Sequence, residues 1–166
     1  VDLGIQTYYP IVYTEFFSAT RKLDARKYGK KIEEAGVEEV KRRIAGGKEI
    51  TKAEHQGAYY RTALKAKQLI RKDFEKAFDV SANGVDVILT PTVPTPSFKI
   101  GEKKDPISMY LSDIFTAPAN LTGMPAMSVP SGAVSRDGKD LPIGLQIMAN
   151  HRREDIIFNI GRLFEQ

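Results

Sequence analysis

Hydrophobic residues recur every three or four positions over two long stretches in the first half of the chain, a spacing typical of amphipathic helices. The first stretch covers about residues 7–23, and the second covers about residues 51–78. In the second stretch the apolar face is formed by Tyr60, Ala63, Leu64, Ile70, Phe74 and Phe78. The pattern therefore predicts two helices, and the second is the longest element of the chain.

The segment between these stretches predicts a charged connector over 24–36 and a short helix over 37–45. Gly46-Gly47 is typical of a helix end, because glycine readily adopts the backbone angles found there. Thr51 and Glu54 have the spacing of a capping box, in which a threonine and a glutamate satisfy the first backbone N–H groups of a helix. We therefore expect the long helix to begin at Thr51.

The second half of the chain changes to short, β-branched runs broken by proline. Residues 85–89 predict a buried strand, and the prolines that follow predict an extended segment. Asp105-Pro106 is typical of a helix start, so a helix is expected to about residue 115. Residues 126–129 and 141–148 predict a hairpin with its loop at 136–139. The final expected helix covers 152–166.

This order of elements predicts a mixed α/β fold, in one domain with a helical part at 1–80 and a strand, helix, hairpin and helix at 85–166. Three strands make a thin sheet for so many helices, since sheets usually have ~4–6 strands. We expect the sheet to continue in residues outside this sequence. The start at Val1 and the helix-like end at Phe164-Glu165-Gln166 also favour a piece of a longer protein.

Composition narrows the possible chemistry. The 166 residues include no cysteine and two histidines, His55 and His151, which excludes disulfides and thiolate metal sites and disfavours a histidine metal cage. No apolar run approaches the ~20 residues that cross a bilayer. Residues 21–76 hold 17 Lys and Arg against 9 Asp and Glu. This basic half is typical either of an RNA-binding surface or of solvated helix faces.

Three features remain as candidates for binding. Arg43, beside Arg42, carries a guanidinium that could hold a carboxylate through two parallel hydrogen bonds, although a plain surface arginine fits the pattern too. Asp113 lies among apolar neighbours and needs a cationic partner, which is either a structural ion pair or a substrate ammonium group. Residues 116–125 form a small-residue run that either lines a site or is a tight structural crossover.

Several segments resemble the amidase signature family. Residues 85–92, Val-Asp-Val-Ile-Leu-Thr-Pro-Thr, are similar to its strand-and-proline segment. Residues 118–130 resemble its Asn-Leu-x-Gly-x-Pro stretch that ends in Ser-Val-Pro. Residues 141–146, Leu-Pro-Ile-Gly-Leu-Gln, resemble one of its strands. The order of the segments makes the combination specific.

Residues 40–44, 99–102 and 109–116 narrow the resemblance to one branch of that family, the A subunits of the glutamyl-tRNA(Gln)/aspartyl-tRNA(Asn) amidotransferases, and to their C-terminal part. The resemblance implies a large mixed sheet flanked by helices, of which this chain holds a portion. It also implies a glutaminase, which hydrolyses glutamine and supplies ammonia for converting Glu-tRNA(Gln) or Asp-tRNA(Asn) into Gln-tRNA or Asn-tRNA.

The resemblance assigns no catalytic residue to this chain. The family's Ser, cis-Ser and Lys triad belongs to a Gly/Ser-rich segment that is absent here, and Ser128, Ser131 and Ser135 do not match it. We therefore expect the chain alone to be inactive. Arg43 matches the arginine that holds the α-carboxylate of glutamine, and Asp113 matches the aspartate that receives its α-ammonium group. His151 lies in a stretch, 149–153, that departs from the family pattern.

The same resemblance sets the expected partners. Glutamine, the B and C subunits of the amidotransferase and, through the complex, the mischarged tRNA are expected, with a cytoplasmic location and no membrane. We expect no metal or cofactor in this chain, and ATP and Mg²⁺ at the partner subunit. Two alternatives remain: a general amidase of the same family with another amide substrate, and a non-catalytic basic module that binds tRNA.

Overall fold

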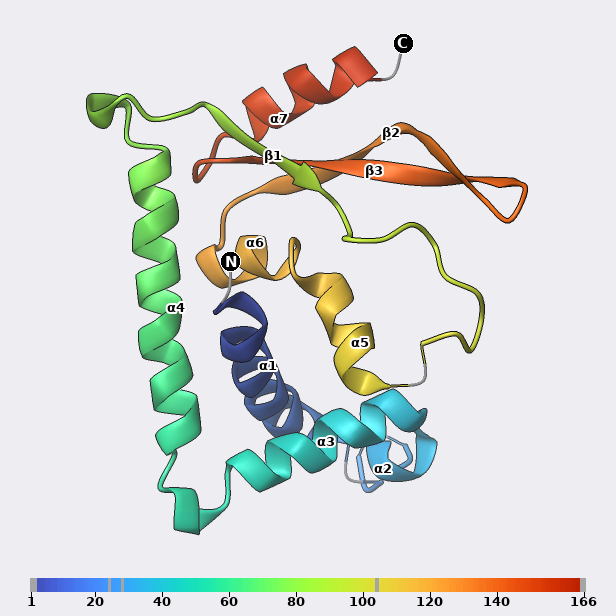
Figure 1. Cartoon of the computed structure of the whole chain (residues 1–166). Helices are drawn as coiled ribbons and strands as arrows, with labels where there is room; N and C mark the ends of the chain where they lie inside the picture. The colour runs from blue at the N-terminus through green and yellow to red at the C-terminus, as the bar shows by residue number, and fades with distance from the viewer. Residues whose placement is uncertain (1–2, 24, 28, 104, 165–166) are drawn as a thin grey trace. The chain divides into compact units, whose positions relative to one another are not determined.

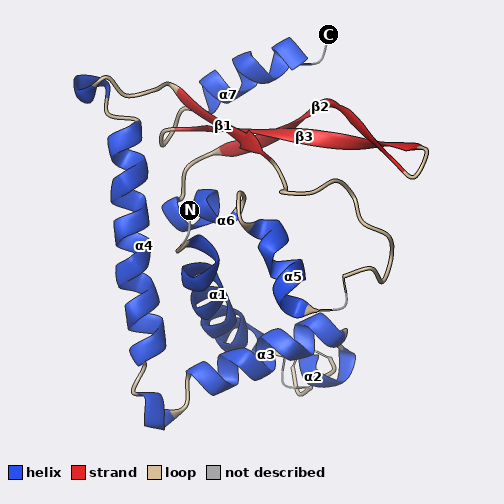
Figure 2. Ribbon diagram, viewed as in Figure 1, coloured by secondary structure: helices blue, strands red, loops and turns tan. Residues whose placement is uncertain are grey.

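A computed structural model describes residues 3–23, 25–27, 29–103 and 105–164. It divides into two compact units, one formed by 6–67 and the other by 1–5 with 68–166. Each is described by itself. The fold is mixed α/β, as the sequence predicts, with an antiparallel sheet of three strands and flanking helices (Figures 1 and 2).

The first unit is helical. Its elements are α1 (Gly4–Thr20), which begins in the other unit, α2 (Ile32–Ala35), α3 (Glu38–Ile50), the 3-10 turn η1 (Ala53–His55) and the start of α4 (Ala58–Ala77). Residues 24–36 were expected to be a connector, and α2 lies within them. Asp24 and Tyr28 fall outside the described residues. The predicted apolar stripe of α4 is confirmed, because Ala63 and Ile70 are buried.

The expected helix end at Gly46-Gly47 is wrong, because α3 continues to Ile50. Both glycines lie where α1 approaches most closely. A methyl group on Gly46 would overlap the ring of Tyr13, and one on Gly47 would overlap the backbone carbonyl of Tyr13. These glycines therefore allow α1 and α3 to pack closely, and they do not end the helix.

The predicted capping box does not form. The Thr51 hydroxyl donates to the Gly47 carbonyl oxygen at 2.8 Å, so Thr51 closes α3 instead of opening α4. Helix α4 begins seven residues later, at Ala58, after two residues with positive φ, Gln56 (46°) and Gly57 (69°). A turn that changes the chain direction thus separates the two helices.

The second unit is built on the sheet. Its elements are the remainder of α4, η2 (Val80–Ala82), β1 (Val87–Pro91), α5 (Pro106–Tyr110), η3 (Leu111–Asp113), α6 (Ala117–Thr122), β2 (Ala126–Arg136), β3 (Lys139–Ala149), α7 (Glu154–Gly161) and η4 (Arg162–Phe164). Strand β3 lies between β1 and β2, and both neighbours pair with it antiparallel.

Strand and helix boundaries differ from the expected ones for local reasons. Strand β1 begins at Val87 and not at Val85, because Val85 donates its N–H to the Ala77 carbonyl and folds back on the end of α4. The hairpin is confirmed and longer than expected, with positive φ at Asp137 (54°) and Gly138 (71°) in its tight turn. The last helix, α7, begins at Glu154.

The two faces of the sheet bury different clusters. One face packs against α7 and contains Val129, Ile147, Ala149 and Ile157. The other contains Met148 with Met124 and Phe78, and Phe74, Ile88 and Ala119 pack against them. Alternate residues of β3 point to opposite faces, so Ile147 and Met148 serve different clusters. Helices α6 and α7 therefore lie on opposite faces of this sheet (Figure 1).

Candidate functional site

Arg43 lies on α3, one turn after Glu39, and is half-buried. Its Nε donates to Glu39 Oε1 at 2.9 Å, and its side chain is 29% exposed. Arg42 also pairs with Glu39, so both arginines share one carboxylate. The bond from Arg43 uses Nε, whereas a bidentate contact with a substrate carboxylate can use the two Nη groups.

Two tyrosines of α1 complete the surroundings of Arg43. Partial burial disfavours its charged form, but the hydrogen bond and negative charge of Glu39, with further contributions from Tyr9 and Tyr13, raise the pKa of Arg43 above its usual value. The rings of Tyr9 and Tyr13 meet edge to face, with centroids 5.6 Å apart. The guanidinium therefore stays charged, with the tyrosines of α1 beside it.

Asp113 is the last residue of η3 and is half-buried. The Asp113 carbonyl oxygen accepts from the backbone N–H of Thr116 at 3.1 Å and from the Thr116 hydroxyl at 3.3 Å. These bonds close a turn between η3 and α6. The expected continuous helix to residue 115 is therefore replaced by α5, η3 and this turn, although Asp105 caps α5 as predicted, accepting from Ser108 N–H at 2.8 Å.

Arg43 and Asp113 belong to different compact units. The structure therefore gives the surroundings of each residue separately. Their joint role in one site stays a prediction from the sequence.

A cavity of about 540 Å³ lies in the second unit. Ser112, the neighbour of Asp113, contributes to its wall, together with β1, the proline segment after it and the β2–β3 hairpin. The wall is largely apolar, and its hydroxyl-bearing residues are Thr90, Thr95, Ser97, Ser112 and Ser131. Such a mixture of apolar surface and a few polar groups is typical of small-molecule sites.

The segment 97–103, whose Ser97 and Phe98 contribute to the cavity wall, is held in place by polar and charged contacts. Lys103 Nζ donates to Ser112 Oγ at 2.6 Å and lies 4.5 Å from the centre of the Phe98 ring. Glu102 pairs with Arg136 of the hairpin at 2.6 Å. A hydrogen bond from the Lys99 N–H, followed by the one from Arg136, lowers the pKa of Glu102 below its usual value. The segment 97–103 is thereby tethered to the hairpin at neutral pH.

Sequence reasoning missed a row of polar side chains on the face of the sheet beside this cavity. Thr90 and Ser128 are the two cross-strand partners of Gln146. Thr92 and Ser128 hydrogen bond at 2.6 Å across Gly144, where an added Cβ would lie 2.8 Å from both hydroxyl oxygens. The signal that could have revealed this row is Gln146 itself, a polar residue between Leu145 and Ile147 in a run of apolar strand residues.

Residues 116–125 form a tightly packed crossover, and their role in lining a site stays a prediction. They contain the unpredicted helix α6, whose Ala117, Pro118, Leu121 and Thr122 are buried. The Thr122 hydroxyl donates to the Pro118 carbonyl at 2.9 Å, and none of these residues contributes to the cavity wall. Small residues are used here because the helix packs closely.

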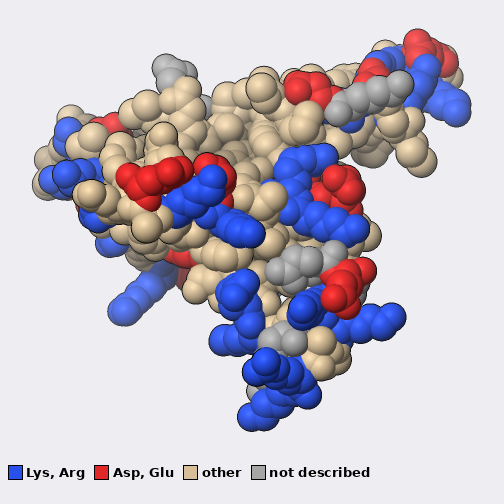
Figure 3. Space-filling model, turned by 90° about the horizontal axis from the view of Figure 1, so that it is seen from below, with Lys and Arg blue, Asp and Glu red and all other residues tan. Residues whose placement is uncertain are grey.

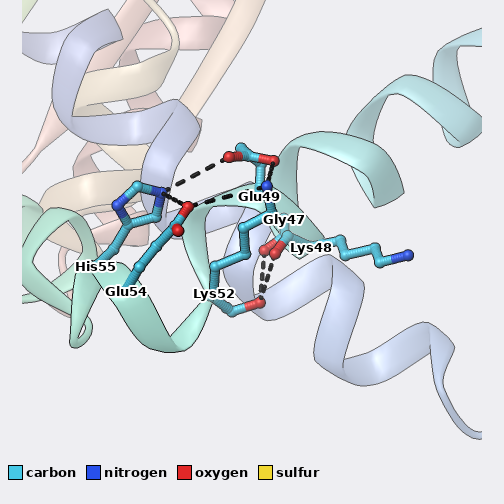
Figure 4. Close-up of polar contacts among 7 residues, drawn as sticks. Gly47, Lys48, Glu49, Lys52, Glu54 and His55 are labelled. Carbon is cyan, nitrogen blue, oxygen red and sulfur yellow. Dashed lines mark hydrogen bonds and ion pairs between the residues drawn. The ribbon is translucent and has the colours of Figure 1, made fainter.

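Among the described residues, one group has the composition of a metal site. Glu49, Glu54 and His55 bring their ligand atoms within 4.8 Å of one another. However, Lys52 Nζ lies 2.7 Å from Glu49 and 4.0 Å from Glu54, so an ammonium group already neutralises the carboxylates (Figure 4). His55 Nε2 lies 3.7 Å from each carboxylate. The arrangement is that of a surface ion-pair network.

Basic side chains gather in places on the face shown in Figure 3 and alternate with acidic ones elsewhere. Several are paired, such as Arg71 with Glu75 at 2.7 Å. In the part of the chain that the structure describes, no helix is long and apolar enough to span a bilayer.

Comparison with known proteins supplies the family. The Amidase family pattern matches residues 1–158. The chain is 49% identical over 149 residues to the glutamyl-tRNA(Gln) amidotransferase A subunit of Methanosphaera stadtmanae, covering 90% of this chain and 31% of that protein. It is 42% identical over 180 residues to a protein of the same name from Clostridium acetobutylicum, covering 99% and 36%. The chain thus spans about a third of the length of these relatives.

Solved structures agree with this assignment. The glutamyl-tRNA(Gln) amidotransferase A subunit from Thermotoga maritima is 38% identical, with a TM-score of 0.50 over 85% of this chain and 30% of that one. A 6-aminohexanoate cyclic dimer hydrolase is 22% identical, with a TM-score of 0.73 over 98% and 34%, and shares the fold. Because the Amidase family pattern matches residues 1–158, nearly the whole sequence, the chain belongs to the amidase family.

Proposed function

We propose that this chain is the glutamine-recognition part of the glutaminase subunit of a tRNA-dependent amidotransferase. The observation that carries the proposal is the 49% identity to a glutamyl-tRNA(Gln) amidotransferase A subunit over 90% of the chain. In this proposal the reaction is hydrolysis of the side-chain amide of glutamine. The released ammonia amidates a glutamate or aspartate esterified to tRNA on partner subunits that use ATP and Mg²⁺.

Arg43 and Asp113 hold the two ends of glutamine that do not react. The Arg43 guanidinium binds the α-carboxylate, and its raised pKa means that it remains charged at every pH of the assay. The Asp113 carboxylate receives the α-ammonium group. Fixing both ends orients the side-chain amide toward the nucleophile, which lowers the entropic cost of the reaction.

The nucleophile lies outside this chain in the proposal. A serine needs an adjacent base before it can attack an amide. The Ser128 hydroxyl is hydrogen-bonded to Thr92 at 2.6 Å, which supports a structural role. The isolated chain is therefore expected to bind but not to hydrolyse glutamine.

The test uses the full-length gene product assembled with its partner subunits. Arg43→Ala and Asp113→Asn should each raise the KM for glutamine roughly 10–100-fold, because a hydrogen bond to a charged group contributes about 1.5–3 kcal/mol. Arg42→Ala is the matched control, since Arg42 pairs with the same Glu39 from the preceding position. Glutaminase kinetics would measure these values.

A second assay, which does not need glutamine, distinguishes a defect in glutamine binding from a misfolded enzyme. Supplying ammonium chloride in place of glutamine removes the need for the glutamine site. Both variants should then amidate tRNA at the wild-type rate. An unchanged KM in both variants would refute the glutamine assignment and favour a general amidase, whose simple amide substrates have no α-amino acid ends.

A further inference from the structure

Gln146 is a deeply buried polar side chain that contacts the turn carrying Asp113. It lies on the central strand β3 and is 4% exposed. A buried amide is costly unless its hydrogen-bonding groups are satisfied. Its side-chain nitrogen donates to Thr90 Oγ1 at 3.1 Å and to the Phe115 carbonyl oxygen at 2.8 Å.

The second of these bonds leaves the sheet. Phe115 lies between Asp113 and α6, in the turn closed by the bonds from Thr116 to the Asp113 carbonyl. The donor and acceptor are 31 residues apart in sequence. A side chain of the sheet is therefore hydrogen-bonded to the segment that contains Asp113.

The chemistry of the glutamine side chain fits this position. Its NH₂ group has two donors, and both neighbours that it meets offer oxygen atoms. A leucine or methionine would leave the Phe115 carbonyl without this donor. A carboxylate would face that carbonyl with a second acceptor. An amide of this length is thus required to hold the turn.

We infer that Gln146 is a positioning residue for glutamine binding, which fixes the turn 113–116 so that the Asp113 carboxylate meets the substrate ammonium group. The inference rests on the proposed role of Asp113. Gln146 acts through that turn and does not itself touch substrate. Its loss should therefore weaken recognition of the α-ammonium group and leave the reacting amide unaffected.

The test compares two substrates in the full-length enzyme. Glutamine carries the α-ammonium group, and 4-carbamoylbutanoate has the same amide and carboxylate without it. Gln146→Met keeps the side-chain length and removes the donors. Both hydrogen bonds of Gln146 are then lost, and loss of the one to Phe115 should raise the KM for glutamine roughly 10-fold. The KM for 4-carbamoylbutanoate and both kcat values should change less than about twofold.

Ser128→Ala is the matched control. Ser128 is the partner of Gln146 on the opposite strand, and its hydroxyl bonds to Thr92 and not to the turn. This variant should leave the ratio of the two KM values unchanged. An equal change for both substrates in Gln146→Met, or no change for either, would overturn the inference.

Asp113→Asn, measured with both substrates, distinguishes failure of the proposed function from failure of the role inferred for Gln146. If Asp113→Asn does not discriminate between the two substrates, the proposed function fails. If Asp113→Asn discriminates and Gln146→Met does not, only the role of Gln146 fails. Should Gln146→Met not fold, hydrogen exchange of the wild type decides: amides of 113–116 as protected as those of β3 support the inference, and amides as fast as those of 97–103 contradict it.

Discussion

At the scale of single residues, glycine and polar side chains have functions here that depend on their neighbours. Gly46 and Gly47 follow helical residues and resemble a helix end, yet both lie inside α3. They are glycines because Tyr13 of α1 occupies the space that a side chain would need. Arg43 and Asp113 are predicted as substrate-binding residues from the sequence, and that role stays a prediction. Gln146 became interpretable only when its partners, Thr90 and Phe115, were known.

Gly47→Ala should destabilise the chain by about 1–3 kcal/mol, because the added methyl overlaps the Tyr13 carbonyl and the helices must move apart. Gly4→Ala is the control: its Cβ would meet only the Pro118 ring at 3.9 Å, so removing a helical glycine should be neutral or stabilise by up to about 1 kcal/mol. Urea unfolding measures both. Equal stabilities would contradict the packing role of Gly47.

At the scale of elements, the beginning of a helix follows local chemistry only where the backbone allows it. Asp105 caps α5 as predicted, since it lies three residues before an N–H that it reaches. Thr51 and Glu54 have an equally good pattern but form no cap, because the chain turns at Gln56 and Gly57. A capping pattern in the sequence thus forms a cap at Asp105 and fails to form one at Thr51.

The two motifs can be compared by mutation. Asp105→Ala should lower the free energy of unfolding by about 1 kcal/mol, the usual cost of removing an N-cap. Glu54→Ala should change it by less than about 0.5 kcal/mol, because Glu54 is exposed and lies at the edge of the ion-pair network of Lys52 and His55. Chemical denaturation gives both values. A loss of about 1 kcal/mol in Glu54→Ala would instead support the capping box at Thr51 and Glu54.

At the scale of the whole molecule, the sheet has three strands in the described residues, few for the number of helices in the chain. Strand β1 is paired on one side, with β3, in the described residues, and Leu89 at its centre is 51% exposed. An apolar edge strand is a template for pairing with another chain. The expectation that the sheet continues in a longer protein stays a prediction.

The chain on its own should therefore self-associate. Light scattering after size exclusion should show dimers or larger species, and Leu89→Lys should increase the monomer fraction, because a lysine on an edge strand opposes pairing. Val80→Lys is the control, as Val80 is 83% exposed and lies in η2 away from the strands. A monomeric wild type would contradict the prediction.

The sequence by itself determined the family, the mixed α/β class, the apolar face of α4, the hairpin and the cap of α5. The family follows from the resemblance of several segments in order, and the other features depend on periodicity or on residues within a few positions of one another. Tertiary structure alone decided the continuation of α3 through two glycines, helix α6 and the polar row on the sheet. These depend on groups distant in sequence, such as Gln146 and Phe115, whose contact exists only after the chain has folded.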